Sequence, residues 1–408
     1  MGLYRYAPPP SGRMGLLWTL GGIRDAAILE FGSMGHMIYA ERWLWQSGID
    51  TGGKLFTTHL DEKDIALGIT KRFSEAVREI IEQRNPRVIF VLPSTIPEII
   101  GTDMEVLCQE AEDECAIPVI ALKKGNFKEK LHNGIEEALY CAVRELACKH
   151  PGAARSEKVT YNLIGSCMDL AKFEADALEL KRLLKEALGM EPICVLSSEA
   201  SVSQIEEMGS AHINLVLRRE GLKAAEELKS RFGTEYVYGL PYGYQGTAAW
   251  LRGIAEQTGL TLNEEFIRRE CAEGHAALQY CRQIAAVYSS RAKISLGGNY
   301  DVVKGILEFA VNEAGLKPNY IWSNAREYAD AFIPYQEEHD LIQNITREFE
   351  GILMADKPAY PMAGRKSGAL INRSLDSRLF NKYESPYMGF RGAMNLCALW
   401  LEELLPSL

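Results

Sequence analysis

The strongest constraint on the fold is a regular alternation of short β-branched segments with amphipathic helical stretches. Buried-strand patterns recur along the chain at 87–94, 117–122, 158–165, 192–198, 213–217, 236–241 and 292–298. Helical patterns lie between them, at 103–114, 173–188 and 222–232 among others. Strands that alternate with helices are typical of parallel sheets whose two faces are both covered by helices. The sequence therefore predicts an α/β protein.

The alternation falls into three series, with seams near Pro151 and Ser289. We therefore expect three Rossmann-like domains around a central cleft, at 1–152, 153–288 and 289–408, the last with a closing helix over 393–404. A chain of 408 residues is long enough for two or three such cores. In sheets of this kind ligands sit at the carboxyl ends of the strands.

Composition narrows the classes of partner. The chain has 45 Lys and Arg against 55 Asp and Glu, a formal net charge of -10, which argues against nucleic acid as the main partner. It has no run of about 18 apolar residues and no apolar signal core at its start, so we expect a cytoplasmic protein without membrane spans. Its nine cysteines form no C-x-x-C pair and do not suggest a disulfide framework.

Two glycine-rich segments are candidate phosphate or anion sites. Residues 48–55 nearly match a phosphate loop, but Leu55 stands where a hydroxyl residue would bind magnesium, so nucleotide hydrolysis is not expected. Gly243 and Gly246 follow a strand and open a helix, whose N-terminus either binds an anion or cofactor or forms an ordinary tight turn.

Several charged and aromatic residues are candidates for a site. Arg218 ends a strand and either grips a carboxylate or phosphate or starts a solvated helix. Tyr387 and Arg391 lie in SPYMGFRG, which favours a close-packed turn lining a cleft or packing two domains together. His36 lies in a glycine-flanked turn and is either a metal ligand or proton carrier or a structural histidine.

The order of motifs resembles the nitrogenase component 1 superfamily over nearly the whole chain. The resemblance rests on WTLGGIRDAAILEFGSMGH (18–36), LFTTHLDEKDIALG (55–68), VLPSTIPEIIGTDMEVL (91–107), GRKSG (364–368) and ESPYMGFRGAMNL (384–396). This superfamily includes the nitrogenase subunits, their cofactor-assembly relatives and the dark-operative tetrapyrrole reductases. The resemblance implies a dimer or larger assembly that receives electrons from a separate ATP-dependent iron–sulfur reductase.

The resemblance also identifies residues that depart from the family pattern. The family's three N-terminal cluster cysteines align with Pro10, His36 and Ile96 of this chain. Of these three residues, only His36 has a side chain able to bind iron. The cysteine that ties the nitrogenase cofactor falls at Arg218, and the cofactor histidine falls near Leu379. Dinitrogen reduction is therefore not expected.

The resemblance implies a subunit of a nitrogenase-like reductase that acts on an organic substrate. An iron–sulfur cluster would be shared with a partner, in a homodimer or in a heteromer with a cysteine-bearing homologue, with His36 as this chain's ligand and Cys108 as a substitute. The expected residues that position the small-molecule substrate are Arg218, Lys366, Tyr387 and Arg391. The alternative is a non-catalytic protein of the same superfamily that binds or assembles a cofactor.

Overall fold

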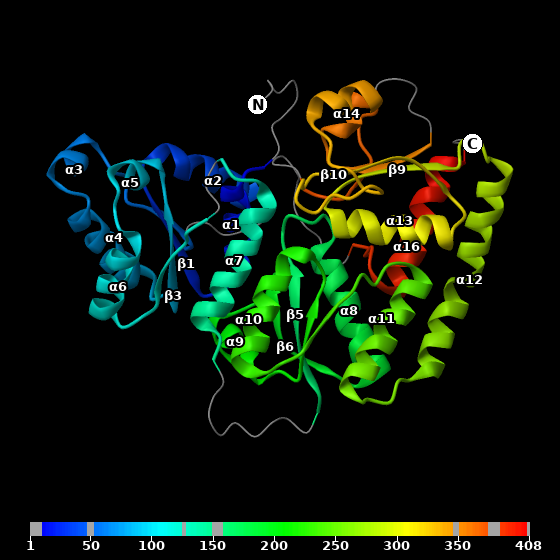
Figure 1. The fold of residues 1–408 in the computed structure, drawn as a ribbon, viewed down its shortest axis with the longest axis horizontal. Helices are drawn as coiled ribbons and strands as arrows, with labels where there is room; N and C mark the ends of the chain where they lie inside the picture. Colours follow the sequence, from blue (N-terminus) through cyan, green and yellow to red (C-terminus); the bar gives the residue numbers. More distant parts are fainter. Residues whose placement is uncertain are drawn as a thin grey trace.

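A computed structural model describes residues 10–46, 53–124, 128–148, 158–345, 351–373 and 384–405. Three separate parallel sheets of four strands each, flanked by helices, make up the protein (Figure 1). The α/β prediction is confirmed. None of the described helices is long and apolar enough to cross a membrane.

The first sheet has the strand order β2-β1-β3-β4. Its strands are β1 (Ala26–Phe31), β2 (Leu55–Thr57), β3 (Val88–Pro93) and β4 (Val119–Ala121). The helices of this unit are α1 (Gly12–Leu20), α2 (Met34–Gln46), α3 (Glu62–Leu67), α4 (Thr70–Arg84), α5 (Thr95–Ile100), α6 (Met104–Cys115) and α7 (Leu131–Leu146). Every residue of β1 is buried, because helices cover both faces of the sheet.

The second sheet has the order β6-β5-β7-β8. Its strands are β5 (Thr160–Ser166), β6 (Glu191–Ser197), β7 (Ile213–Val216) and β8 (Tyr236–Tyr238). Its helices are α8 (Phe173–Leu188), α9 (Val202–Glu206), α10 (Leu222–Phe232), α11 (Gly243–Thr258) and α12 (Glu264–Val287), with short turns η2 (Glu207–Ser210) and η3 (Arg219–Gly221).

The third sheet has the order β10-β9-β11-β12. Its strands are β9 (Lys293–Gly298), β10 (Lys317–Ser323), β11 (Ile352–Ala355) and β12 (Ala369–Leu370). Four helices follow or separate these strands: α13 (Tyr300–Asn312), α14 (Glu338–Ile345), α15 (Ala359–Met362) and α16 (Gly389–Leu404). The three sheets fall one in each of the predicted ranges 1–152, 153–288 and 289–408, and the boundaries themselves remain predictions.

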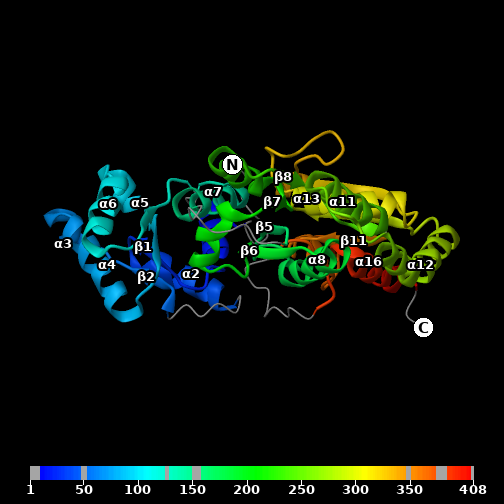
Figure 2. The same ribbon diagram turned by 90° about the horizontal axis from the view of Figure 1, so that it is seen from below.

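Helices shared between units hold the protein together. α7 pairs with α1 and also packs against α10 of the second unit, while α16 packs against α12, α11 and α8 (Figure 1). The N-terminal unit and α12 lie at opposite ends of an elongated molecule (Figure 2). The predicted turn SPYMGFRG differs from the structure in one respect, since Gly389–Gly392 form the first turn of α16.

The contact between α1 and α7 depends on glycine. A Cβ added at Gly134 would fall on the backbone carbonyl of Gly12, and one added at Gly15 would fall on the carbonyl of Leu131. The two helix backbones therefore approach more closely than any larger residue at these positions permits. This pair of helices links the first sheet to the second unit.

Candidate functional site

The carboxyl ends of strands from the second and third sheets meet at a buried junction, which is where ligands bind in many α/β proteins. Arg218 lies just beyond β7 and makes four hydrogen bonds there. Its Nη1 and Nη2 donate to the two carboxylate oxygens of Asp169 at 2.7 and 3.0 Å. Its Nε and Nη2 donate to Glu220 at 2.9 and 2.8 Å. Four of the five guanidinium N–H groups are thus engaged within the chain.

Two asparagines of the third unit complete this arrangement. The Asn299 side chain donates to Glu220 Oε1 at 3.1 Å, and the Asn372 side chain donates to Asp169 Oδ2 at 3.4 Å. Asn372 Oδ1 also accepts the backbone N–H of Asn299 at 2.6 Å. Asp169, Arg218, Glu220, Asn299 and Asn372 form the junction network, which links the second unit to the third.

Burial and charge act against each other in the junction network. Burial raises the pKa of Asp169, although the charge and hydrogen bonds of Arg218 oppose the rise. Burial also disfavours the charged form of Glu220, but there the guanidinium prevails and the pKa lies below its ordinary value. Arg218 stays charged, because the two carboxylates raise its pKa against the effect of burial.

The predicted anion site at Gly243 and Gly246 is filled by a carboxylate of the chain itself. Glu313, at the end of α13, accepts the backbone N–H of Tyr244 at 3.1 Å and that of Gln245 at 3.1 Å. Gly243 has φ +71°, and an added Cβ would meet the Glu313 carboxylate. The N-terminus of α11 therefore already holds its negative charge, where the helix dipole favours one.

The other three residues predicted to position the substrate take no part in the hydrogen bonds described for the junction network. Tyr387 is buried, and its backbone N–H donates to Asp176 Oδ1 of α8 at 2.7 Å. Arg391 leaves its side chain 60% exposed, while its backbone N–H donates to Glu179 at 3.2 Å. Lys366 is exposed. The structure does not bring Lys366, Tyr387 and Arg391 into one hydrogen-bonded group with Arg218, and their role in substrate binding stays a prediction.

The described residues at the N-terminal cluster positions do not fit an iron–sulfur cluster. Pro10 and Ile96 carry no donor atom, and the His36 side chain, like Leu379, lies outside what the structure describes. Cys108 is buried in the core between α6 and the sheet, and burial together with Glu112 and Glu105 raises its pKa to about 12. Such a thiol keeps its proton and is a poor metal ligand. Within the described ranges no group of three or more His, Cys, Asp or Glu side chains is arranged to hold a metal ion.

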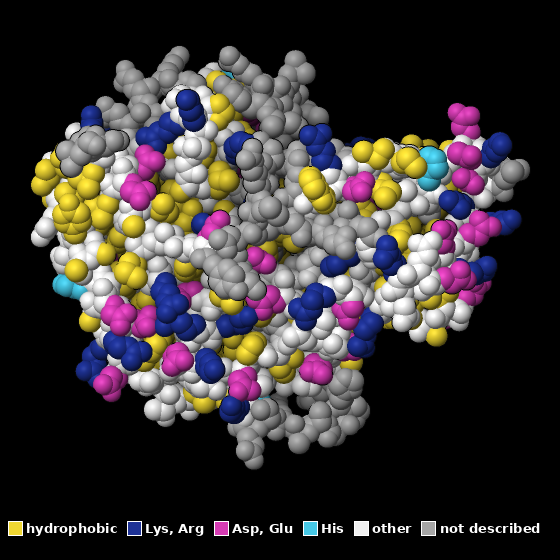
Figure 3. All heavy atoms as spheres, turned by 180° about the vertical axis from the view of Figure 1, so that it is seen from behind, with side chains coloured by type: hydrophobic (Ala, Val, Ile, Leu, Met, Phe, Trp, Pro, Cys, Tyr) yellow, Lys and Arg dark blue, Asp and Glu magenta, His cyan; other side chains and the backbone are white. Residues whose placement is uncertain are grey.

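Apolar side chains are exposed along the carboxyl edge of the first sheet. They come from α2 and α5, which begin just after β1 and β3, and from the neighbouring α3 and the start of α6. We call these residues the edge patch: Met34, Ile38, Ile65, Ile99, Ile100 and Val106, which are between 42% and 79% exposed. Hydrophobic side chains along this edge are visible on the N-terminal unit in Figure 3. An exposed apolar group of this kind is typical of a protein–protein contact.

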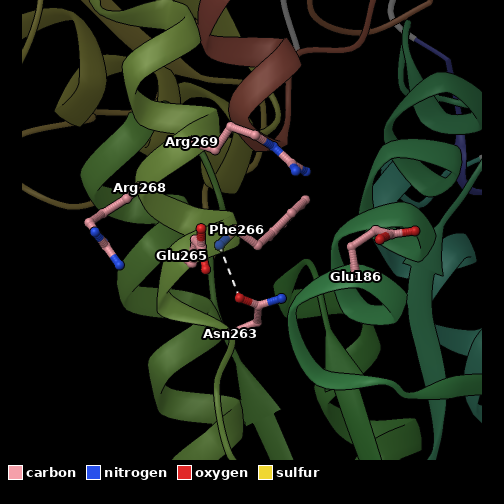
Figure 4. Close-up of a pocket in the computed structure, with 6 residues that line it drawn as sticks. All are labelled: Glu186, Asn263, Glu265, Phe266, Arg268 and Arg269. Atoms are coloured by element: carbon pink, nitrogen blue, oxygen red, sulfur yellow. Dashed lines mark hydrogen bonds between the residues drawn. The ribbon is translucent and has the colours of Figure 1, made fainter.

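A surface hollow of about 500 Å³ lies between α8 and the start of α12, and its lining contains none of the predicted site residues. Glu186, Asn263, Glu265, Phe266, Arg268 and Arg269 line it (Figure 4). Arg269 and the Phe266 ring point towards the side of Glu186, whereas Arg268 points away (Figure 4). Its mixed charges give it no preference for one class of ligand.

Sequence reasoning found Arg218 but missed its partners. Asn299 directly follows β9, and Asn372 lies two residues after the end of β12. Asp169 lies three residues after the end of β5. A polar residue just beyond a buried strand was therefore the available signal. The sequence gives no sign that these side chains bond one another, because up to 203 residues separate them.

Comparisons with known proteins agree with this architecture. The family model for nitrogenase component 1 type oxidoreductases matches residues 11–405. The chain is 25% identical to the nitrogenase iron-molybdenum cofactor biosynthesis protein NifE of Clostridium pasteurianum, over 82% of this chain and 71% of that protein. It is also 25% identical to a subunit of the light-independent protochlorophyllide reductase of Heliobacterium modesticaldum, over 83% of this chain and 66% of that protein.

The fold also matches a solved nitrogenase structure. "Nitrogenase Cp1 at pH 6.5" superposes with a TM-score of 0.77 at 18% identity, covering 99% of this chain and 95% of the other. At this identity the match shows the fold alone, whereas the family model spans almost the whole sequence. The chain therefore belongs to the nitrogenase component 1 type oxidoreductase family.

Proposed function

We propose that this chain is a subunit of a nitrogenase-like reductase that acts on an organic substrate and not on dinitrogen. It pairs through the edge patch with a homologous subunit that carries the cluster cysteines, and an ATP-dependent iron–sulfur reductase supplies the electrons. The observation that carries the proposal is the edge patch, which lies on the edge where the family places its cluster, in a chain whose described residues offer no ligand set there.

The edge patch supports a partner because of where its residues stand. Met34 and Ile38 lie on α2, the helix that contains His36, and Ile99 and Ile100 lie on α5, the helix that contains Ile96. A surface that covers these apolar side chains would also enclose both family cluster positions. Interfaces of this kind bury an apolar centre inside a polar rim.

A partner that brings cysteines also accounts for the departures at Pro10 and Ile96. A bridging cluster can take most of its ligands from one subunit, and His36 is then the single side chain that this chain contributes. The junction network supports the exclusion of dinitrogen reduction, because the resemblance aligns the cofactor cysteine with Arg218, whose guanidinium is bonded to Asp169 and Glu220.

A second candidate is favoured by the relatives. NifE, which is named as a cofactor biosynthesis protein, is among the proteins that resemble this chain in sequence. Under this alternative the chain is a non-catalytic subunit that helps to bind or assemble a metal cofactor. Both candidates need a partner subunit, and they differ in whether electrons flow to a substrate.

The pairing is tested by co-producing the chain with a cysteine-bearing homologue without oxygen, then measuring the mass and iron content of the complex. Ile99→Asp should weaken the association by about tenfold or more, because it places a charge in the apolar centre of the contact. Val287→Asp is the matched control, since Val287 is 72% exposed on α12 at the far end of the molecule. Equal association of both variants would contradict the proposed surface.

The two candidates are separated by adding the ATP-dependent reductase to the purified complex. ATP-dependent oxidation of the reductase's own iron–sulfur centre, together with reduction of an added tetrapyrrole, would support the reductase subunit. Uptake of a metal cofactor without any such electron flow would instead support the assembly protein.

A further inference from the structure

The fold favours ligand binding at the junction of the second and third units, because the carboxyl ends of strands from two sheets meet there. It is also the place at which the resemblance puts the cysteine that ties the nitrogenase cofactor, here Arg218. The side chains present do not fit that role. A guanidinium bears a positive charge and has no lone pair to offer a metal.

The junction has no room left for a ligand. Each side chain of the junction network is at most 3% exposed, so none faces an open cavity. Asp169 accepts two hydrogen bonds from Arg218 and one from Asn372, and Glu220 accepts two from Arg218 and one from Asn299. Both carboxylates are therefore satisfied by the chain itself.

The glycines at the strand ends also indicate that the junction has no space for a ligand. Glycine at such a position usually lets a ligand approach the backbone. A Cβ added at Gly165, at the end of β5, would lie 2.7 Å from Cγ of Arg218. One added at Gly298, at the end of β9, would lie 2.6 Å from Oδ1 of Asn372. The space that these glycines leave is taken by the junction network.

The charges of the junction do not favour an added anion. Asp169 and Glu220 face a single guanidinium, that of Arg218, and a third carboxylate, Asp356, accepts the backbone N–H of Asn372 at 3.2 Å. A cofactor that carried further negative charge would add to these carboxylates, and one that needed a thiolate ligand would find only the buried thiol of Cys167, whose pKa burial raises to about 12.

We infer that the junction network replaces a bound cofactor as the element that joins the second and third units, so that this chain holds no cofactor between them. This inference does not rest on the proposed pairing through the edge patch, and it concerns the isolated chain. Its failure would leave that pairing untouched, and the reverse is also true.

The experiment compares three variants by thermal unfolding. Arg218→Met leaves two buried carboxylates without their cation and should lower the unfolding midpoint by roughly 5–10 °C. The neutral triple variant Arg218→Met, Asp169→Asn, Glu220→Gln should recover at least half of that loss, because neither of the carboxylates that faced Arg218 is then charged. Arg252→Met is the matched control, since Arg252 pairs with Glu264 at 3.1 Å where both side chains are more than half exposed, and its loss should cost less.

Ligand binding is tested on the same wild-type chain. Isolated iron–molybdenum cofactor is added without oxygen, and hydrogen exchange is followed in the peptides that contain Asp169, Arg218 and Asn299. We expect slow exchange before the addition and no change after it. Stoichiometric binding that further protects these peptides would overturn the inference. So would an Arg218→Met variant as stable as wild type, or a neutral triple variant no more stable than Arg218→Met.

Discussion

Asp176 makes the stability of this protein depend on pH in an unusual direction. Its carboxylate is buried in α8 and accepts the backbone N–H groups of Tyr387 and Met388 at 2.7 and 2.8 Å, which anchors the segment before α16. Burial raises the pKa of Asp176 to about 7, although these two hydrogen bonds oppose the rise. The folded protein therefore binds a proton here that the unfolded chain releases near its ordinary pKa of 3.8.

The sign and size follow from linkage between protons and folding. Between about pH 4 and pH 7 the native state holds more protons at Asp176 than the unfolded state, so stability falls as pH rises through this window. At about 1.4 kcal/mol for each tenfold change in proton affinity, the full difference costs roughly 4 kcal/mol above pH 7. Asp176→Asn keeps the acceptor oxygen for both N–H groups but removes the charge.

We expect Asp176→Asn to be more stable than wild type at pH 8, by up to roughly 4 kcal/mol, and to lose more than half of this advantage at pH 5. Urea unfolding of both proteins at the two pH values measures the difference, with Asp113→Asn on the exposed face of α6 as the control. Because other buried acids are the same in both proteins, the comparison isolates Asp176. A variant that is less stable than wild type by the same amount at both pH values would refute the reasoning.

Two further predictions concern helix ends and helix contacts. Gly134→Val should separate α1 from α7 and lower the unfolding midpoint by several degrees or abolish soluble expression, because any Cβ at Gly134 meets the carbonyl of Gly12. Gly253→Val, on α11 where an added Cβ meets nothing within 4 Å, serves as the comparison and should cost much less. Glu313→Ala should destabilise the protein by about 1–2 kcal/mol in urea unfolding, since it strips the N-terminus of α11 of its carboxylate, whereas Glu313→Gln should restore part of this by accepting the same N–H groups. Equal losses for Ala and Gln would mean that these hydrogen bonds contribute little.

The strands could be predicted from the sequence because each buried strand is a short local run of apolar residues. The stretch expected as a strand over 87–94 contains β3 (Val88–Pro93), and the one expected over 213–217 contains β7 (Ile213–Val216). A strand buried on both faces consists almost entirely of apolar residues, and this property needs no knowledge of the strand's neighbours. The order of the strands within each sheet is not recorded in this way.

The partners of the site residues could not be predicted from the sequence. Arg218 shows in the sequence only as a cation after a strand, and the same pattern fits a solvated side chain or a ligand clamp. Its bond to Asp169 spans 49 residues, and the bond between Tyr244 and Glu313 spans 69. Such pairs are chosen by the packing of whole units. The glycine pattern at Gly243 predicts either an anion site or an ordinary tight turn, and in the structure the N-terminus of α11 holds the carboxylate of Glu313.

The position of α16 has a consequence for synthesis on the ribosome. α12 ends at Val287, and its main packing partner α16 begins at Gly389, after the entire third sheet. Until α16 emerges, the buried face of α12, which includes Phe266, Leu278 and Cys281, has no cover from that helix. The second unit therefore cannot finish folding in the order in which it is made. A nascent chain halted before Gly389 would expose the apolar face of α12, and chaperones bind exposed apolar surfaces.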